Sequence, residues 1–304
     1  MQGFVKDKVV LVTGAGGGIG RDCALALGRE GAKVIVNDVG ASLQGESEDL
    51  SRAQSVVDEI MEEGGVASAN TESVADWQGA NNMVQQAVET YGRIDAIINN
   101  AGILRDRFFF NMSVEEWKAV IDVHLNGTFY VSRAAAPFFR EQESGSYIHM
   151  VSTSGLIGNF AQANYSAAKL GMVALSKSIA MDMAKFHVRS NCIAPFAWSR
   201  MISSIPTETE EQKERVDRLK RMDTAKIAPL AVYLCSDEAS KVSGQVFSVR
   251  ANEIFLMSQS RPLRSMHSGE GWTPQTIADR AMPALRSDFY PLDRSQDVFD
   301  WDPV

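Results

Sequence analysis

Residues 9–20 read Val9-Val10-Leu11-Val12-Thr13-Gly14-Ala15-Gly16-Gly17-Gly18-Ile19-Gly20, and this stretch decides the fold of the chain. Its first four residues form a continuous apolar run, mostly β-branched, which is typical of a strand buried on both faces of a parallel sheet. The glycine turn leads into a helical pattern from Arg21 to Glu30. A strand, a glycine turn and a helix in this order point backbone N–H groups at a phosphate. The stretch therefore predicts a dinucleotide-binding unit.

The type of dinucleotide is indicated by an acid after the second strand. Glycines suit the first turn because a Cβ would block the approach of a pyrophosphate, although the spacing of Gly14, Gly18 and Gly20 differs from the commoner G-x-G-x-x-G. The next strand, Lys33 to Asn37, ends in Asp38, which lies 38 − 18 = 20 residues after Gly18. A carboxylate at this place accepts hydrogen bonds from both ribose hydroxyls and repels a 2′-phosphate. The pattern predicts NAD rather than NADP; the alternative is an ordinary Asp at a strand end.

Strand and helix patterns alternate along the rest of the chain. This alternation predicts an α/β fold, a Rossmann-type doubly wound parallel sheet of about seven strands with helices on both faces. We expect one dinucleotide-binding and catalytic domain over residues 1–256. After it the composition changes to Pro, Ser, Trp and Met, and residues 257–304 are expected to form a C-terminal extension that packs on the core or on a neighbouring subunit.

Two residues four apart carry the predicted chemistry. Tyr165 and Lys169 lie in a helical run through Ala184, so they share one helix face. A phenol beside an ammonium is expected to have its pKa lowered from about 10 towards neutrality, which suits a general acid or base. Ser152 follows the strand from Ser146 to Val151 and precedes Tyr165 by 13 residues, enough for a loop to bring both hydroxyls to one carbonyl. The alternative is a chance Tyr and Lys on a long helix.

Composition excludes several classes of function. The net charge of −8 over 304 residues, without a block of Lys and Arg, argues against a nucleic-acid partner. Three cysteines without CxxC spacing predict buried, reduced thiols, no disulfide and no metal site. No apolar stretch approaches the roughly 18 residues that span a bilayer, and with only a short polar lead before the first strand we expect no signal peptide. We therefore expect a cytoplasmic protein without a membrane partner.

Four motifs in register resemble those of the short-chain dehydrogenase/reductase family over roughly residues 5–250. They are the glycine turn, Asn99-Asn100-Ala101-Gly102, Ser152, and Tyr165 with Lys169. The resemblance implies a Rossmann-type fold, a homodimer or homotetramer, and hydride transfer between a nicotinamide and an alcohol or carbonyl carbon.

The resemblance also implies a role for each matching residue. Tyr165 would be the acid/base, Lys169 would lower its pKa and hold the nicotinamide ribose, and Ser152 would orient the substrate oxygen. Further cofactor contacts are implied for Gly14, Gly18, Ile19, Gly20, Asp38, Glu72, Ser73, Asn99 and Pro195.

Two departures from the family pattern narrow the resemblance. His124 occupies the place of a usual Asn, where an imidazole can still hold the water that links Lys169 to solvent, and Phe196 follows Pro195 in place of a usual Gly. With Gly158-Asn159-Phe160 and the segment from Ala101 to Arg107, these features resemble the (3R)-hydroxyacyl-CoA dehydrogenase region of peroxisomal multifunctional enzyme type 2. That enzyme carries hydratase and sterol-carrier regions as well, and this chain is expected to be a stand-alone relative.

The sequence thus predicts an NAD-dependent oxidoreductase, with a 3-hydroxyacyl-CoA of a fatty, sterol or terpenoid acid as substrate. One alternative keeps the site and takes a free hydroxysteroid or terpenoid alcohol. Another is a non-catalytic dinucleotide-binding regulator. A charged segment from Glu208 to Arg221 suits a lid over the substrate or a solvated face. Arg105 and Arg107 suit an acidic ligand group or a surface loop.

Overall fold

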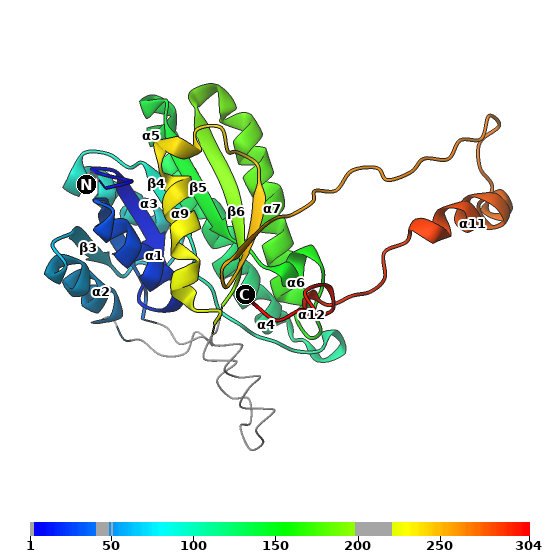
Figure 1. The fold of residues 1–304 in the computed structure, drawn as a ribbon, viewed down its shortest axis with the longest axis horizontal. Helices are drawn as coiled ribbons and strands as arrows, with labels where there is room; N and C mark the ends of the chain where they lie inside the picture. The colour runs from blue at the N-terminus through cyan, green and yellow to red at the C-terminus, as the bar shows by residue number, and fades with distance from the viewer. Residues whose placement is uncertain (1–2, 41–48, 50, 198–220) are drawn as a thin grey trace, which may run out of the picture.

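One mixed sheet of eight strands runs through the protein in the order β3-β2-β1-β4-β5-β6-β7-β8 (Figure 1). This computed structural model describes residues 3–40, 49, 51–197 and 221–304. The chain reverses its winding between β1 and β4, and such a switch point is where open α/β sheets bind ligands. The strands are β1 Val9–Thr13, β2 Lys33–Asn37, β3 Val66–Asn70, β4 Ala96–Asn99, β5 Gly145–Met150, β6 Val188–Phe196, β7 Val246–Arg250 and β8 Glu253–Leu256.

The predicted Rossmann-type doubly wound sheet of about seven strands is confirmed, and one strand that the sequence did not indicate is added at its edge. The seven strands β1 to β7 pair in parallel, and β8 adds an antiparallel edge strand. A tight turn with Ala251 in the left-handed region (φ 52°) folds β8 back on β7. This strand was not predicted because the consecutive residues Ile254, Phe255 and Leu256 are all apolar. They therefore lack the alternation of apolar and polar residues that indicates a strand with one buried face.

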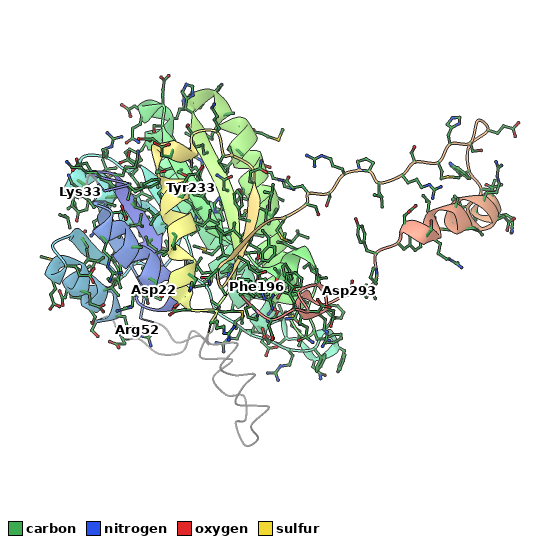
Figure 2. All side chains as sticks on the ribbon, in the orientation of Figure 1. Asp22, Lys33, Arg52, Phe196, Tyr233 and Asp293 are labelled. Carbon is green, nitrogen blue, oxygen red and sulfur yellow. The ribbon has the colours of Figure 1, made fainter. Side chains whose placement is uncertain are left out.

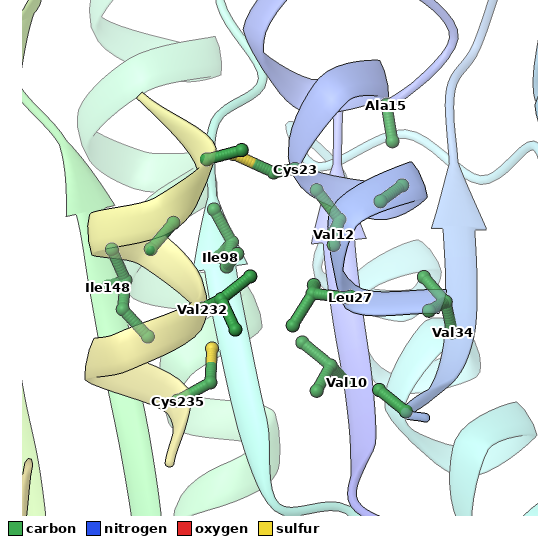
Figure 3. Close-up of a cluster of buried hydrophobic side chains, with 14 of the residues drawn as sticks. Val10, Val12, Ala15, Cys23, Leu27, Val34, Ile98, Ile148, Val232 and Cys235 are labelled. Carbon is green, nitrogen blue, oxygen red and sulfur yellow. The ribbon is translucent and has the colours of Figure 1, made fainter. Parts of the chain in front are cut away.

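Helices cover both faces of the sheet. On one face α1, α2 and α9 bury apolar side chains against Val10 and Val12 of β1, with Ile98 and Ile148 from the neighbouring strands (Figure 3). On the other face α3, α5 and α7 pack against Val9 and the alternate residues of the strands. The main helices are α1 Gly18–Arg29, α2 Ser51–Glu62, α3 Trp77–Tyr91, α4 Val114–Ile121, α5 Gly127–Gln142, α6 Thr153–Leu156, α7 Ala163–Asp182 and α9 Ala228–Cys235.

The C-terminal residues leave the core and come back to it. After β8 the chain runs out to a short helical group, α10 Pro274–Thr276 and α11 Met282–Leu285 joined by a π-helical turn, and then returns (Figure 1). α12, Ser295–Val298, rejoins the core, where the Ser295 amide donates to the Gly158 carbonyl at 3.0 Å. Figure 2 shows the side chains of the outer part standing away from the core. The segment thus consists of a projecting arm and an anchored end.

Some expectations fall on parts of the chain that are not described. Residues 208–220 of the expected lid lie outside the described residues. Among the helices that are described, none is long and apolar enough to cross a bilayer. The three cysteines, Cys23, Cys192 and Cys235, are buried.

Candidate active site

The glycine turn after β1 has the shape that an anion requires. A Cβ on Gly14 would lie 2.7 Å from the Ala101 Cα, and one on Gly20 would lie 2.3 Å from the Gly14 carbonyl oxygen. The N-cap of α1, Gly17, makes no side-chain hydrogen bond, and the first turn holds no acidic residue. The first N–H groups of α1 are therefore not taken by a side-chain cap, and the helix dipole favours a negative charge there. These residues fit the pyrophosphate of a dinucleotide, with Ile19 on the first turn.

Asp38 lies against this turn. One of its carboxylate oxygens accepts a hydrogen bond from the Gly16 amide at 2.8 Å and the other from the Gly40 amide at 2.7 Å. Glu72 and Ser73 follow β3 at the same sheet edge, and the Glu72 carbonyl accepts from the Asn37 amide group at 2.8 Å. The structure therefore brings the predicted adenosine-side residues to one edge.

Asn100 is a structural residue of this turn, a role that its place in the sequence motif did not indicate. Its side-chain amide donates to the carbonyl oxygens of Thr13 at 3.1 Å and Gly14 at 2.9 Å. The Thr13 hydroxyl accepts from the backbone amides of Asn100 and Ala101 at 3.0 and 3.1 Å. The Asn99-Asn100 pair was noted as a motif, but nothing in the sequence says that the second amide holds the glycine turn.

Ser152, Tyr165 and Lys169 are brought together at the ends of β5 and α7. Ser152 caps α6, and its hydroxyl accepts from the Ser154 amide at 3.1 Å. The Ser152 hydroxyl lies close enough to the phenol of Tyr165 to act on its pKa, which it lowers. The Lys169 amine lies 5.5 Å from the centre of the Tyr165 ring and donates to the carbonyl oxygen of Met150. The arrangement can bind one oxygen atom between two hydroxyls.

The pKa of Tyr165 is not lowered as the sequence suggested. Burial raises it to about 12, with the hydrogen bond from Ser152 working in the opposite direction. Burial also lowers the pKa of Lys169 to about 7. The reason is desolvation, which disfavours the charged form of each group and exceeds the effect of their proximity. The cofactor-free pair therefore favours a neutral phenol.

His124 is buried beside the phenol. It lies in the π-helical turn Asp122–Asn126 between α4 and α5, and its ring stands perpendicular to the Tyr165 ring with centroids 5.2 Å apart. Nε2 lies 2.8 Å from the Ile103 carbonyl oxygen and 3.1 Å from the Ile103 backbone nitrogen. Nδ1 is buried without a hydrogen-bond partner. Burial, with the nearby Lys169, lowers the pKa of His124 to about 3, so the ring is neutral.

Phe196 turns towards the C-terminal end of the chain. Its ring packs on Phe299 with centroids 4.8 Å apart, next to Pro195 at the end of β6. Phe299 also contacts Trp301, and the Arg250 guanidinium lies 5.2 Å from the Trp301 ring. In Figure 2 the labelled Phe196 lies on the side of the core to which the chain returns. The sequence did not predict this cluster, which joins the end of β6 to the last residues.

A groove opens beside α6 and the start of α7. It has a volume of about 500 Å³ and is lined by Phe108, Phe109, Phe110, Phe160 and the polar residues Ser154 and Ser166, among others. Three of the four aromatic side chains are more than two-thirds exposed. Arg107 beside them pairs with Glu116 at 3.0 Å, which favours the surface-loop reading for this arginine. Across the described residues, no group of three or more His, Cys, Asp or Glu side chains is arranged to hold a metal ion.

Comparison with known proteins agrees with this geometry. The profile of the short chain dehydrogenase family matches residues 8–209. The chain belongs to the short chain dehydrogenase family. As a member it is an oxidoreductase that interconverts an alcohol and a ketone and binds a nicotinamide dinucleotide.

Individual relatives include a multifunctional enzyme and a hydroxyacyl-CoA dehydrogenase. Peroxisomal multifunctional enzyme type 2 of Mus musculus is 43% identical over 274 residues, which are 90% of this chain and 36% of that enzyme. The hydroxyacyl-CoA dehydrogenase ChsB1 of Mycobacterium tuberculosis is 38% identical over 287 residues, 90% of this chain and 87% of that protein. The crystal structure of a short chain dehydrogenase from Mycobacterium avium superposes with a TM-score of 0.83 at 40% identity, covering 95% of this chain and 98% of that one. The chain spans about a third of the mouse enzyme, and the resemblance to it is confirmed.

Proposed function

We propose that this short chain dehydrogenase oxidises a 3-hydroxyacyl-CoA to the 3-oxoacyl-CoA with NAD. The observation that carries the proposal is the convergence of Ser152, Tyr165 and Lys169 beside an aromatic groove. A curated relative that matches 90% of the chain is named a hydroxyacyl-CoA dehydrogenase, which supports the substrate class.

In the proposed reaction the protein binds the substrate oxygen and moves one proton. Ser152 and Tyr165 hydrogen-bond the hydroxyl oxygen of the substrate, and Tyr165 removes its proton as general base. A bound nicotinamide dinucleotide supplies the acceptor for the hydride that leaves the carbon. Lys169 stabilises the phenolate by its charge and is proposed to hold the nicotinamide ribose. In the reverse direction Tyr165 donates the proton.

His124 is proposed to complete the path of the proton to solvent. The Ile103 backbone occupies Nε2, and Nδ1 is buried next to Tyr165 without a partner. A buried ring nitrogen of this kind calls for a hydrogen-bond partner, and a water molecule between Nδ1 and the Lys169 amine would provide one. The imidazole would then do the work of the usual Asn.

Cofactor binding is assigned to the carboxyl edge of β1 to β4 and to β6. We propose that Asp38 binds the adenosine ribose and selects NAD over NADP, because a carboxylate repels a 2′-phosphate. The pyrophosphate would lie on the first turn of α1. The remaining contacts in this assignment come from Gly14, Gly18, Ile19, Gly20, Glu72, Ser73, Asn99, Tyr165, Lys169 and Pro195.

The aromatic groove is proposed to hold the apolar chain of the substrate. Ser154 and Ser166 in its wall are neighbours of Ser152 and Tyr165 in sequence, so the groove starts beside the reacting oxygen. Burial of methylene groups on Phe109 and Phe160 would favour long acyl chains. A free hydroxysteroid or terpenoid alcohol could use the same groove and remains the second candidate. The presence of Ser152, Tyr165 and Lys169 argues against a non-catalytic regulator.

We propose that the protein is a homodimer or homotetramer in which the projecting arm contacts a neighbouring subunit. The proposed division places the catalytic domain at 1–256 and the extension at 257–304. The arm carries exposed apolar side chains that a single copy leaves in water: Leu263, Phe289, Tyr290 and Leu292.

The cytoplasmic location remains a prediction, supported by the three unpaired cysteines.

The experiment is a spectrophotometric screen of NADH formation with acyl-CoA, steroid and terpenoid alcohols, each 3-hydroxyacyl-CoA offered as both enantiomers. We expect the highest kcat/KM with a 3-hydroxyacyl-CoA and NAD. Equal rates with the matched free alcohols would overturn the acyl-CoA assignment, and equal rates with NADP would overturn the role of Asp38.

A further inference from the structure

A row of buried polar side chains crosses the sheet just below the catalytic residues. It consists of Ser132 on α5, Asn99 on β4, His149 on β5, Ser190 on β6 and Ser176 on α7, and all five side chains are buried. Asn99 and His149 are direct partners in the parallel register of β4 and β5. Farther from the site, the same face of these strands is apolar, with Ile97 and Tyr147. The buried side chains on this face of the sheet are thus apolar far from the site and polar next to it.

Each member of this polar row is bonded to the next. The Asn99 side-chain nitrogen lies 3.1 Å from the Ser132 hydroxyl and 3.2 Å from His149 Nδ1. His149 Nε2 lies 3.1 Å from the Ser190 hydroxyl, which lies 2.8 Å from the Ser176 hydroxyl. A chain of five paired side chains of this kind rigidifies the groups at both of its ends.

The hydrogen-bond directions follow from the chemistry of the groups. Asn99 donates both amide hydrogens, one to Ser132 and one to Nδ1, so Nδ1 is an acceptor and Nε2 carries the proton that goes to Ser190. Burial lowers the pKa of His149 to about 3, which keeps the ring in this neutral form. The carbonyl oxygen of Asn99 is left for other partners.

The polar row reaches residues of the site at Asn99 and at its α7 end. Asn99 precedes Asn100, whose amide holds the glycine turn. Ser176 lies seven residues, or two helical turns, after Lys169 on the same face of α7. Lys169 in turn donates to the carbonyl oxygen of Met150, the residue next to His149. A shift of the His149 imidazole would therefore displace Asn99 at the sheet edge proposed to bind the cofactor, and also α7, which carries Tyr165 and Lys169.

We infer that His149 is a positioning residue for hydride transfer. It holds Asn99 at the sheet edge where the dinucleotide would bind. Through Ser190 and Ser176 it also fixes the distance between the sheet and the helix that carries Tyr165 and Lys169. The inference rests on the proposed dehydrogenase site but not on the acyl-CoA substrate. Neither His149 nor Ser176 touches the reacting atoms in this proposal.

The test compares His149→Phe with His149→Gln in the full-length protein. Glutamine has an oxygen that can accept from Asn99 and a nitrogen that can donate to Ser190, whereas phenylalanine has neither. We expect His149→Phe to lower kcat about tenfold or more, as small displacements of catalytic groups do, with little change in KM for the alcohol. NADH affinity, measured by fluorescence titration, should fall severalfold. His149→Gln should restore both quantities to within about threefold.

Tyr147→Phe is the matched control. Tyr147 lies on the same strand and face and donates a buried hydrogen bond to the Ser132 carbonyl at 2.9 Å, on the side of the row away from the site. This variant should have a lower melting temperature than the wild type, with unchanged kcat and NADH affinity. If His149→Phe behaves like Tyr147→Phe, or if His149→Gln is as impaired as His149→Phe, the inference is wrong.

Two further measurements keep the test decisive. If His149→Phe does not fold, Ser176→Ala breaks only the α7 end of the row and should lower kcat while NADH affinity stays unchanged; unchanged kcat would contradict the inference. If the wild type oxidises no 3-hydroxyacyl-CoA, the substrate proposal fails, and the kcat comparison is made with whichever alcohol the screen identifies. If the screen identifies no alcohol substrate, the test rests on the NADH affinities of His149→Phe and His149→Gln relative to the wild type.

Discussion

The amine nitrogen of Lys169 lies 5.5 Å from the centre of the Tyr165 ring, and both groups are buried deeply enough to shift their pKa values away from the charged forms. Burial raises the pKa of Tyr165 to about 12 and lowers that of Lys169 to about 7. Proximity of an ammonium favours a phenolate, but desolvation disfavours both charges and is the larger effect here. In the cofactor-free protein Tyr165 therefore keeps its proton and is a neutral phenol.

Tyr165→Phe should abolish turnover, because it removes the hydroxyl that is proposed to exchange the substrate proton. General acid–base groups contribute about 10²- to 10⁴-fold to a rate, so we expect a loss of kcat of at least that order. NADH binding should be nearly unchanged, since the ring remains. Tyr130→Phe, a tyrosine on α5 that packs on Trp77, is the control and should keep full activity. Substantial residual turnover in Tyr165→Phe would assign the proton transfer to another group.

Lys169 should make the stability of the cofactor-free protein depend on pH. Its pKa falls from 10.5 in the unfolded chain to about 7 in the folded protein, so between these values the unfolded state binds more protons. Stability then rises with pH across this window, by at most about 1.4 kcal/mol per pH unit. Urea unfolding would be measured for wild type and Lys169→Met at about pH 6, 8 and 9.5, which lie below and within this window. The free energy of unfolding of the wild type, relative to that of Lys169→Met, should increase as pH rises. A difference that stays constant would mean that Lys169 is charged in the folded protein.

His124 offers a test of the proton path. His124→Asn restores the side chain that the family usually has there and should keep most of the activity. His124→Leu fills a similar volume without a ring nitrogen that can hold the water, so it should lower kcat about tenfold or more and raise the solvent isotope effect, because proton transfer becomes slower. NADH affinity is the internal check and should be alike in both variants. Equal kcat for His124→Leu and wild type would exclude the imidazole from the path.

The sequence was sufficient for the parts of the site that depend on backbone pattern. The glycine turn, Asp38 at the end of β2 and the Tyr165–Lys169 spacing follow from strand and helix periods, which are local. The direction of the Tyr165 pKa shift was wrong because it depends on burial, and burial is set by the whole fold. The edge strand β8 was missed because its apolar residues do not alternate.

Contacts between distant segments were beyond sequence reasoning. The pairing of Phe196 with Phe299 joins residues 103 positions apart, and nothing local predicts it. The link from Asn99 to His149 requires the register of β4 and β5, which fixes which residues face each other. His149 itself lies in a strand that reads as buried, where a polar side chain has no visible partner until the sheet is assembled.

Phe160 should influence the length of acyl chain that the enzyme prefers. It lines the aromatic groove and is exposed, so an acyl chain could cover it. Each buried methylene contributes about 0.8 kcal/mol, so Phe160→Ala should lower kcat/KM for a long-chain 3-hydroxyacyl-CoA about tenfold and leave a four-carbon substrate nearly unaffected. Phe129→Ala removes an exposed phenylalanine on α5 that does not line the groove, and it should preserve the chain-length profile. Parallel losses at all chain lengths would place the acyl chain elsewhere.

The projecting arm should contribute to subunit assembly. Tyr290 and Leu292 are exposed in the single chain, and burying a large apolar side chain in an interface contributes about 1.5–3 kcal/mol. Replacing both with Asp should therefore weaken the oligomer strongly, which sedimentation velocity over a range of concentrations would detect. Ser287→Asp adds charge at another exposed arm position without removing apolar surface, and it should leave the assembly intact. The melting temperature of the core should be similar in all three proteins at high dilution, because the arm's outer part projects away from its own core (Figure 1). A wild-type monomer, or a double variant that assembles as the wild type does, would show that the arm has another role.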